Sequence, residues 1–481
     1  MFFIYGFVSD EGRGSQGDVR GKLARAIGAN DMNAQAYVDL AAECREIGAL
    51  PSGCIGLLDG YKISAGSTPL HRLALMSQQN PVPITPEMAQ SAIEAQWSVL
   101  PAEQRPLEQC IGQILRQEVL PERDNPPFDR ACMDGIAIKS TTLAQGVRRY
   151  TIEGLQAAGS PPLELVNASN AVEVMTGAVM PRGTDCVIPM EEYEQAAEIV
   201  ALKDHVRAAP FRNVQRRGED GQLGVPMLRP GTRLGAAEIA VVASAGLASV
   251  AVSRQPDFMV VSTGDELVEP GEPIAEHQVR RSNAYAIVSA LRSRGFANID
   301  NDHIIDDEEA LSGRLRQHLN ERDVLILSGG VSKGKFDLVP KVLKSLGVRE
   351  VFYQVAQRPG MPMWFGVGPA GQVVFGLPGN PVATMVCLIR YVVPAAFVAM
   401  GARKGPQEKI RLAAPVKQGR AMTYFLPVSV APDDSGLPSA LPRPPNGPGD
   451  FLALTGADGF VQLPPQPEGF PAGFVAALYR W

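Results

Sequence analysis

Apolar and polar residues follow several different patterns along this chain of 481 residues. Between residues 257 and 400, short apolar runs such as DFMVVST, DVLILSGG and QVVFGLPG alternate with helix-like segments such as AYAIVSALRSRG and DEEALSGRLRQHLNE. Strands that alternate with helices are typical of a parallel sheet covered by helices. We therefore predict an α/β domain over residues 254–403 with a parallel-type sheet.

Two other regions have the pattern of β domains. From about residue 148 to 218, short apolar runs are separated by turn residues, which predicts a mostly β domain. Beyond residue 405, short strands and proline-rich turns predict a small barrel or sandwich. Residues 1–80 stand apart, have no GxxxxGK[ST] phosphate loop, and stay an unassigned N-terminal extension.

Composition narrows the functional class. The net charge of −6 excludes the strongly basic surface of a nucleic-acid-binding protein. The six cysteines form no CxxC pair and the histidines no HExxH, which predicts free thiols in a reducing cytoplasm and no zinc site. No stretch reaches the ~20 apolar residues of a membrane span, and we expect 385–400, the longest apolar segment, to be a core helix.

The segment SGGVSKGKFD (328–337) follows an apolar strand and precedes a helix-like segment. Its glycines allow close approach of the backbone to a ligand, and amides exposed at a helix start favour an oxyanion. A carboxylate at Asp337 would repel that anion unless a cation lay between them, which indicates an anion bridged by a metal. The alternative is a tight turn needed only for packing.

Two further turns follow the same logic. STGDELV (262–268) ends a strand in adjacent acids, Asp265 and Glu266, and GLPGNPVA (376–383) forms a rigid turn before a helix. Ligands of open α/β sheets bind outside the carboxyl ends of the strands, so we expect these turns to share one edge with SGGVSKGKFD. The alternatives are an acidic helix cap and a plain turn.

Two acidic segments lie earlier in the chain. NPPFDRACMDGIAIK (125–139) and RRGEDG (216–221) contain acids within irregular stretches, and surface turns would explain either one alone. Their ordered combination with EVMTGAVMP, STGDELV, RRSNAYAI, SGGVSKGKFD, RPGMPMWFG and GLPGNP over about residues 83–481 resembles the molybdopterin molybdenumtransferase family, which includes the gephyrin C-terminal region.

This resemblance implies an elongated multidomain α/β plus β protein. A split linker-type domain (83–126 and 219–253) would flank a β-rich insertion (127–218), followed by the pterin-binding α/β domain (254–403) and a C-terminal β barrel (408–481). It implies a cytoplasmic homodimer, with each site between the α/β domain of one chain and the β insertion of the other. It also implies insertion of molybdenum from molybdate into adenylylated molybdopterin, release of AMP and the cofactor Mg²⁺.

The resemblance also assigns residues to the site. It implies a catalytic set of acids: Asp134, Asp220, Glu266, Asp306 and Asp337. Two of these acids, Glu266 and Asp337, would also be metal ligands. It implies a substrate-binding set in the turns: Thr176, Ser328, Gly329, Gly330, Ser332, Lys335, Arg358, Pro378, Gly379, Asn380 and Pro381. Phosphoanhydride cleavage needs charge neutralisation and in-line positioning, which a carboxylate-held Mg²⁺ can supply.

The chain departs from the family around RPGMP. Relatives usually have KPGKP, whereas this chain has Arg358 and Met361, and Gln354 where some members have lysine. Arginine can bind an oxyanion in bidentate fashion, but methionine cannot bind it electrostatically. Lys333 and Lys335 are candidates to compensate.

Two classes of function therefore stay open. Retention of the acidic set favours the transferase, and loss of lysine at Met361 favours a non-catalytic pterin-binding scaffold. The sequence does not separate molybdate from tungstate, and it does not assign residues 1–80, for which docking to other cofactor-assembly proteins is one role. No nucleic-acid or membrane partner is expected.

Overall fold

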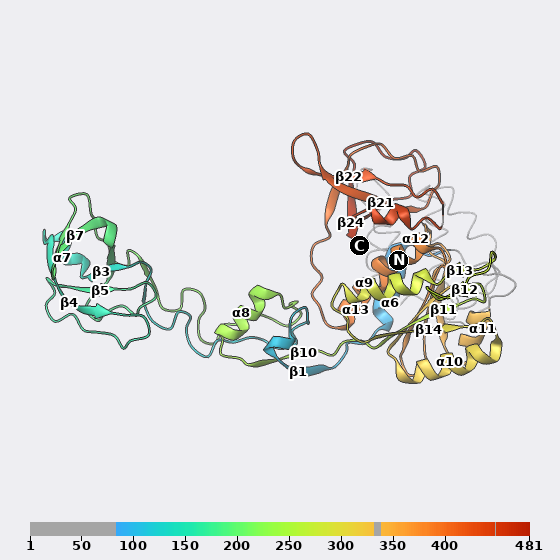
Figure 1. Ribbon diagram of the computed structural model, residues 1–481, viewed down its shortest axis with the longest axis horizontal. Helices are drawn as coiled ribbons and strands as arrows, with labels where there is room; N and C mark the ends of the chain where they lie inside the picture. The colour runs from blue at the N-terminus through green and yellow to red at the C-terminus, as the bar shows by residue number, and fades with distance from the viewer. Residues whose placement is uncertain (1–82, 331–337, 448) are drawn as a thin grey trace, which may run out of the picture. The chain divides into compact units, whose positions relative to one another are not determined.

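A computed structural model describes residues 83–330, 338–447 and 449–481 (Figure 1). The predictions for residues 1–80, and those for Ser332, Lys335 and Asp337, lie outside the described residues. The described chain contains a two-stranded split domain, a β insertion, an α/β domain and a C-terminal barrel.

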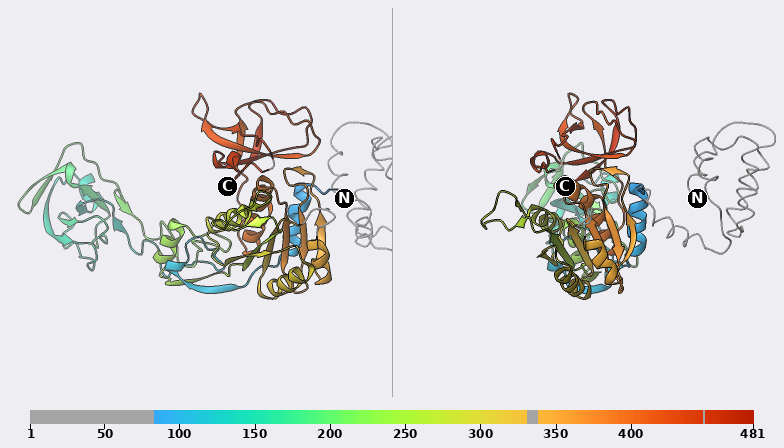
Figure 2. Two further views of the ribbon diagram at one scale, coloured as in Figure 1. Left: turned by 45° about the vertical axis from the view of Figure 1, so that its right-hand side comes forward. Right: turned by 90° about the vertical axis from the view of Figure 1, so that its right-hand side faces the viewer.

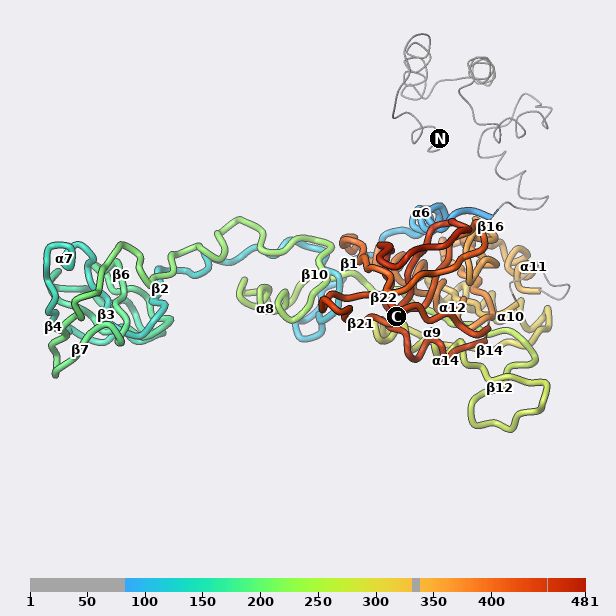
Figure 3. Tube along the Cα trace, turned by 90° about the horizontal axis from the view of Figure 1, so that it is seen from above, coloured from blue at the N-terminus to red at the C-terminus, as the bar shows by residue number. Residues whose placement is uncertain are grey.

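The split domain is built from two segments that lie far apart in the sequence. Strand β1 (Ala102–Pro106) pairs antiparallel with β10 (Ser249–Ser253), and helix α8 (Ala236–Ser244) and the 3-10 turn η1 (Leu107–Gln109) complete it. Isolated bridges, Val119 with Leu228 and Asn125 with Gly221, continue the pairing toward the insertion. Figures 1 and 3 show the two connecting segments side by side.

The β insertion is a six-stranded sheet in the order β6-β3-β5-β4-β8-β7. Its strands alternate or are fully apolar and bury one shared core, which includes Ile136, Tyr150 and Val200. The elements are β2 (Arg130–Ala131), β3 (Gly135–Ile138), α7 (Ser140–Ala144), β4 (Arg149–Gln156), β5 (Ala171–Val174), β6 (Cys186–Pro189), η2 (Met190–Glu192), β7 (Tyr193–Ala196), β8 (Ile199–Leu202) and β9 (Val214–Gln215). The predicted β-rich character of this region is confirmed.

The α/β domain has a six-stranded sheet in the order β14-β11-β15-β19-β18-β16. Its strands are β11 (Phe258–Thr263), β14 (Ile299–Ile304), β15 (Val324–Ser328), β16 (Arg349–Tyr353), β18 (Trp364–Val367) and β19 (Val373–Leu377). A short parallel pair, β12 (Leu267–Val268) and β13 (Val279–Arg280), lies outside this sheet in a loop that projects from the domain in Figure 3. Continuous burial of β11, β15 and β19 explains their apolar sequences, because both faces are covered by helices.

Helices cover the two faces of this sheet (Figure 2). One core contains residues of four elements, α6 (Pro86–Gln96), α9 (Ser282–Arg292), α12 (Pro381–Cys387) and α13 (Val393–Ala399), with the π-helix η3 (Leu388–Val392) between the last two. The other core contains residues of α10 (Glu308–Glu321) and α11 (Leu338–Ser345). The doubly covered α/β architecture agrees with the predicted fold class.

The sheet is mixed, and its four parallel strands agree with the predicted parallel-type sheet. Strands β14, β11, β15 and β19 are parallel, but β18 is antiparallel to both β19 and β16. The reason is the connection length, because no helix lies between β16 and β19 to carry the chain back across the sheet.

The register of the four parallel strands places the predicted turns at one edge. Ser262 of β11 pairs with Ser328 of β15, which pairs with Leu377 of β19, and Thr263 pairs with Ile304 of β14. The chain therefore leaves all four strands at the same carboxyl edge, where ligands of open α/β sheets bind.

The C-terminal region is a closed five-stranded barrel. Strands β21, β22, β20, β24 and β23 follow one another, and β23 pairs with β21 to close the ring. Its elements are β20 (Lys409–Leu412), β21 (Thr423–Pro432), β22 (Pro438–Pro442), α14 (Leu452–Thr455), β23 (Gly459–Leu463) and β24 (Val475–Arg480). A short strand of the α/β domain, β17 (Gln357–Arg358), pairs with β21 from outside the ring. Closure leaves the ring without free edges.

One helical segment of the described chain, Pro381–Ala399, is long and apolar enough by length and composition to cross a membrane. Of the apolar stretch of this segment, 78% is buried, and its residues pack in the core of the α/β domain. This burial accounts for the apolar sequence and agrees with the predicted core helix. The four described cysteines are free thiols.

A partly buried ion pair fixes the connection between the split domain and the α/β domain. Arg254 donates through Nη1 and Nη2 to the two Asp323 oxygens at 2.7 and 2.9 Å, and the amide of Asp257 donates to Oδ2 of Asp323 at 2.9 Å. Burial raises the pKa of Asp323, but the hydrogen bonds from Arg254 and Asp257 outweigh it and leave that pKa below its ordinary value.

We expect Asp323→Asn to lower the free energy of unfolding by about 1–3 kcal/mol at pH 7, because Arg254 loses its charged partner. Since the folded-state pKa of Asp323 is depressed, the stabilisation exists above the unfolded-state pKa and disappears as the pH falls through the folded-state value. Denaturant unfolding should therefore show a difference that shrinks below about pH 4. The control, Asp300→Asn, removes the charge of an exposed carboxylate that pairs with Arg322 and should change stability by less than about 0.5 kcal/mol. A pH-independent difference for Asp323→Asn would contradict this account.

Candidate functional site at the carboxyl edge of the α/β sheet

The turn after β15 brings the backbone close to β11. Ser328 is buried, and Gly329 and Gly330 have φ values of 97° and 61°, which a residue with a side chain rarely adopts. A Cβ atom at Gly329 would lie 2.8 Å from the carbonyl oxygen of Thr263. Glycine is therefore needed here for packing between the strand ends.

Asn283, at the start of α9, ties two of the turns together. Its Nδ2 donates to Oγ of Ser328 and to the carbonyl oxygen of Gly379, both at 2.9 Å. Its Oδ1 and Oγ1 of Thr263 are buried and have no hydrogen-bond partner within the described ranges. Buried oxygens without donors are costly, so the described chain leaves two polar atoms unsatisfied at this edge.

The GLPGNP turn is held rigidly. Oγ1 of Thr384 donates to the carbonyl oxygens of Pro378 at 2.5 Å and Asn380 at 2.9 Å, and Oδ1 of Asn380 caps α12 by accepting from Ala383 N at 3.3 Å. Pro381 occupies the first helical turn. The predicted residues Pro378, Gly379, Asn380 and Pro381 thus lie beside the Ser328–Gly330 turn at one edge.

Acidic side chains lie at the ends of β11 and β14. The amide of Asp306 donates to Oδ1 of Asp265 at 3.1 Å, and Glu266 follows Asp265 directly. All three residues are exposed, and the Glu266 carboxylate has no hydrogen bond or ion pair within the described part of the chain. The structure therefore brings Glu266 and Asp306 to the edge that the turns occupy.

Asp134 and Thr176 form a pair on the β insertion. Oδ1 of Asp134 accepts from the Thr176 amide at 2.6 Å and from Oγ1 of Thr176 at 2.8 Å. These hydrogen bonds, the amide's first, lower the pKa of Asp134 below its ordinary value. Gly135 permits this placement, because a Cβ atom there would lie 2.0 Å from the carbonyl oxygen of Ile188.

Asp220 lies where the chain leaves the insertion. Its amide donates to the carbonyl oxygen of Asn125 at 2.8 Å, and its Oδ2 accepts from Nε2 of Gln215 at 2.9 Å. Within the described residues, no hydrogen bond or ion pair joins Asp220, the Asp134–Thr176 pair and the edge of the α/β sheet to one another. The predicted site residues thus form three separate groups within one chain.

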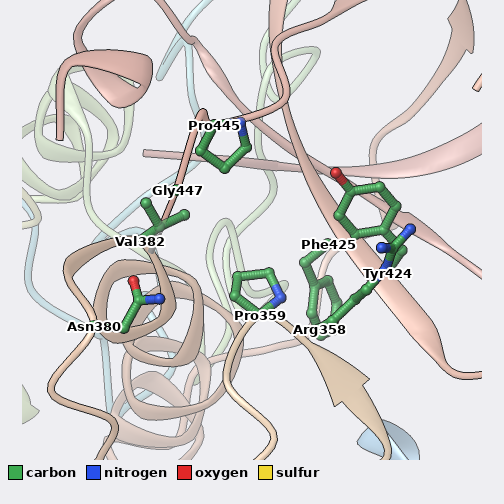
Figure 4. A pocket seen from close by; sticks show the side chains of 8 residues that line it. All are labelled: Arg358, Pro359, Asn380, Val382, Tyr424, Phe425, Pro445 and Gly447. Carbon is green, nitrogen blue, oxygen red and sulfur yellow. The ribbon is translucent and has the colours of Figure 1, made fainter. Parts of the chain in front are cut away.

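Arg358 lines a pocket of about 190 Å³ between the GLPGNP turn and the barrel (Figure 4). Its guanidinium carbon lies 3.8 Å from the centroid of the Tyr424 ring, and its Nη2 donates to the carbonyl oxygen of Gln418 at 2.8 Å. Its Nε is buried and lacks a hydrogen-bond partner in the described chain. The pocket is lined by Arg358, Pro359, Asn380, Val382, Tyr424, Phe425, Pro445 and Gly447. A cationic donor in a small, mostly apolar pocket is suited to an oxyanion.

A metal site is not evident in residues 83–330, 338–447 and 449–481, where no three His, Cys, Asp or Glu side chains are grouped to hold an ion. Asp337, one of the two predicted metal ligands, lies outside these ranges.

Sequence reasoning missed Asn283, Gln418 and Tyr424. The segment RRSNAYAI places Asn283 at the start of a helix near a strand end, which was a usable signal. Gln418 and Tyr424 carry no local signal, because they reach Arg358 only through the pairing of β17 with β21.

Family models match almost all of the described chain. The MoeA N-terminal region (domain I and II) matches residues 84–246, the probable molybdopterin binding domain matches 259–397, and the MoeA C-terminal region (domain IV) matches 409–481. An α/β domain with a ligand edge, flanked by a split domain with its β insertion and by a barrel, is thus the architecture of a known class of molybdopterin-binding proteins.

Individual relatives agree. The molybdopterin molybdenumtransferase of Synechocystis sp. is 36% identical over 390 residues, which cover 81% of this chain and 97% of the relative. That of Staphylococcus epidermidis is 29% identical over 77% of this chain and 88% of its own length. The crystal structure of a molybdopterin biosynthesis MoeA protein from Pyrococcus horikoshii has a TM-score of 0.67 at 28% identity and covers 83% of this chain and 99% of its own. The chain belongs to the molybdopterin molybdenumtransferase family.

Replacement of Thr176 tests the Asp134 pair directly. We expect Thr176→Val to raise the pKa of Asp134 toward its ordinary value, because the Oγ1 donor is lost while the amide donor stays. Thr176→Ser keeps both donors and should leave the low pKa in place. Carbon-detected NMR titration of the Asp134 carboxyl measures this. An equal pKa in the wild type and Thr176→Val would show that the side-chain hydrogen bond has no influence.

Proposed function

We propose that the protein inserts molybdenum from molybdate into adenylylated molybdopterin, with release of AMP, in molybdenum cofactor biosynthesis. The observation that carries the proposal is the pocket against the barrel, whose lining includes Arg358 and, from the GLPGNP turn, Asn380. Both substrates are anions, and a guanidinium offers them charge and direction together. Membership of the family supports the same reaction.

The chain's own residues have separate parts in this proposal. Ser328, Gly329 and Gly330, with Ser332 and Lys335, hold the phosphate region, while the buried oxygens of Thr263 and Asn283 accept from pterin N–H groups. Asp134 and Thr176 contribute to the site from the β insertion, and Asp220 contributes from the segment where the chain leaves the insertion. Cleavage of the phosphoanhydride expels AMP after attack on phosphorus by an oxygen of molybdate or water, so no side-chain nucleophile is needed.

The proposal includes Mg²⁺ at the acidic end of the edge. Exposed carboxylates at Asp265, Glu266 and Asp306 are oxygen donors of the kind that Mg²⁺ prefers, and Glu266 has no competing partner in the described chain. We assign Glu266 and Asp337 as its ligands. When bound, the ion would neutralise the charge that develops on the phosphoanhydride oxygens.

We further propose that the active form is a cytoplasmic homodimer. Each site would combine the α/β edge of one chain with the Asp134 and Asp220 groups of the other, which explains why these groups are separate within one chain. Docking of other cofactor-assembly proteins is part of the proposal, with no nucleic-acid or membrane partner. The alternative, a non-catalytic pterin-binding scaffold, is favoured by Met361, which stands exposed where relatives have lysine.

The first test mixes the purified chain with adenylylated molybdopterin, Mg²⁺ and molybdate and follows AMP release. We expect release that depends on molybdate and falls roughly 100-fold or more in Glu266→Gln, because an electrostatic group at the reacting phosphate is lost. Asp433→Asn, on an exposed barrel turn, is the matched control and should keep wild-type rates. Tight binding of the pterin without AMP release in the wild type would favour the scaffold.

Mixing of variant subunits tests the shared site. Asp134→Asn and Arg358→Gln should each be nearly inactive alone, but re-assorted equal amounts should recover about a quarter of wild-type activity, because half of the dimers carry one intact site of two. A mixture of Glu266→Gln and Arg358→Gln is the control and should recover nothing, since both changes lie in the same α/β domain. Recovery in neither mixture would place each whole site within one chain.

A further inference from the structure

The barrel approaches Arg358 through a backbone pairing and a side-chain stack. β17 pairs in parallel with β21, so that Gln357 lies opposite Thr423 and Arg358 opposite Tyr424. The Arg358 guanidinium lies over the Tyr424 ring with 3.8 Å between its carbon and the ring centroid. This distance is well inside the range of a cation–π interaction.

The barrel side of this contact is rigid. Gln418 is buried, and its Nε2 donates to the carbonyl oxygens of Met422 at 2.5 Å, Pro464 at 3.1 Å and Arg420 at 3.2 Å. The segment just before β21 is thereby fixed, together with the Gln418 carbonyl that accepts from Nη2 of Arg358. The ring and this carbonyl restrain the guanidinium from two directions.

The α/β side holds the backbone of the same turn. Gln357 is fully buried, and its Nε2 donates to the carbonyl oxygens of Pro359 at 3.2 Å and Gly360 at 3.3 Å. Its Oε1 accepts from the hydroxyl of Tyr391, which is also fully buried. The backbone that carries Arg358 is therefore anchored in the core of the α/β domain.

The contact with Tyr424 involves the ring and not the hydroxyl. Burial raises the pKa of Tyr424 despite the opposing effect of the Arg358 charge, so the phenol is neutral at physiological pH. Its hydroxyl makes no hydrogen bond to any described residue. A phenylalanine ring would therefore make the same stack, whereas an aliphatic side chain of similar bulk would not.

We infer that Tyr424 is a positioning residue: its ring holds the Arg358 guanidinium against the pocket, so that the guanidinium charge faces an oxyanion bound there. This inference rests on the proposed function for the identity of the oxyanion as molybdate. With one face covered by the ring and Nη2 engaged by Gln418, the guanidinium keeps a single orientation. An arginine without this support would spread over many rotamers and lose orientational entropy on binding.

The experiment compares Tyr424→Leu with Tyr424→Phe. Loss of the ring should raise the molybdate concentration for half-maximal AMP release roughly tenfold, the effect of removing one cation–π contact. The turnover at saturating molybdate and the half-saturating concentration of adenylylated molybdopterin should stay close to wild type. Tyr424→Phe keeps the ring and should behave as wild type in all three quantities.

Two results would overturn the inference. One is equal dependence on molybdate in Tyr424→Leu and Tyr424→Phe. The other is a loss in Tyr424→Leu that lowers turnover and the affinity for both substrates alike, as a structural defect would. A double-mutant cycle adds a further check: in an Arg358→Gln background, Tyr424→Leu should have no additional effect on molybdate dependence.

Direct binding separates this inference from the proposed function. If the wild-type chain releases no AMP, the proposed function fails, and calorimetric titration with molybdate alone then decides the role of Tyr424. Roughly tenfold weaker binding by Tyr424→Leu than by wild type and Tyr424→Phe supports it. Equal binding by the three proteins, or no binding by the wild type, overturns it.

Discussion

The close approach of three turns at the carboxyl edge of the α/β sheet is the constraint on which the rest of the site depends. Gly329 and Gly330 pass against Thr263, and a Cβ atom at Gly379 would lie 3.7 Å from the Cα of Gly329. Side chains at Gly329 and Gly330 would clash with Thr263 and separate the strand ends, whereas Gly379 lies at ordinary contact distance. The Asn283 amide then links the turns with two hydrogen bonds of 2.9 Å. Glycines supply the proximity, and the asparagine fixes it, so that donors and acceptors from distant segments face one space.

The distribution of charge at this edge explains why acids and anions belong together here. Asp265, Glu266 and Asp306 are exposed at the strand ends and would repel a phosphate in the absence of a cation. Arg358 lies on the other side of the GLPGNP turn, in the pocket against the barrel. The edge is therefore divided into an acidic part suited to a cation and a part with one guanidinium suited to an oxyanion. A reaction that joins two anionic substrates needs both parts, because neither substrate can be neutralised by the other.

Much of the fold was predictable, because local patterns decide it. The apolar runs of β11, β15 and β19 are continuous since both sheet faces are covered, and the glycine-rich turns had to follow them at one edge. The antiparallel β18 was missed because the connection from β16 has no helix, a feature that strand-like segments alone do not reveal. Tyr424 was missed for a related reason: its partner, Arg358, is a neighbour only through a strand pairing between domains. The separation of Asp134 from Glu266 within one chain was likewise beyond local patterns.

The replacement of lysine by arginine and methionine in RPGMP changes what the neighbouring structure must provide. An ammonium group is a compact charge whose three donors turn freely, so it binds an oxyanion without a fixed orientation. A guanidinium is planar, and its value to an oxyanion depends on the direction of its edge. Here the Tyr424 ring, the Gln418 carbonyl and the buried Gln357 amide fix that direction. The barrel, which lies outside the α/β domain that holds the turns, thus becomes part of the anion site because this chain uses an arginine.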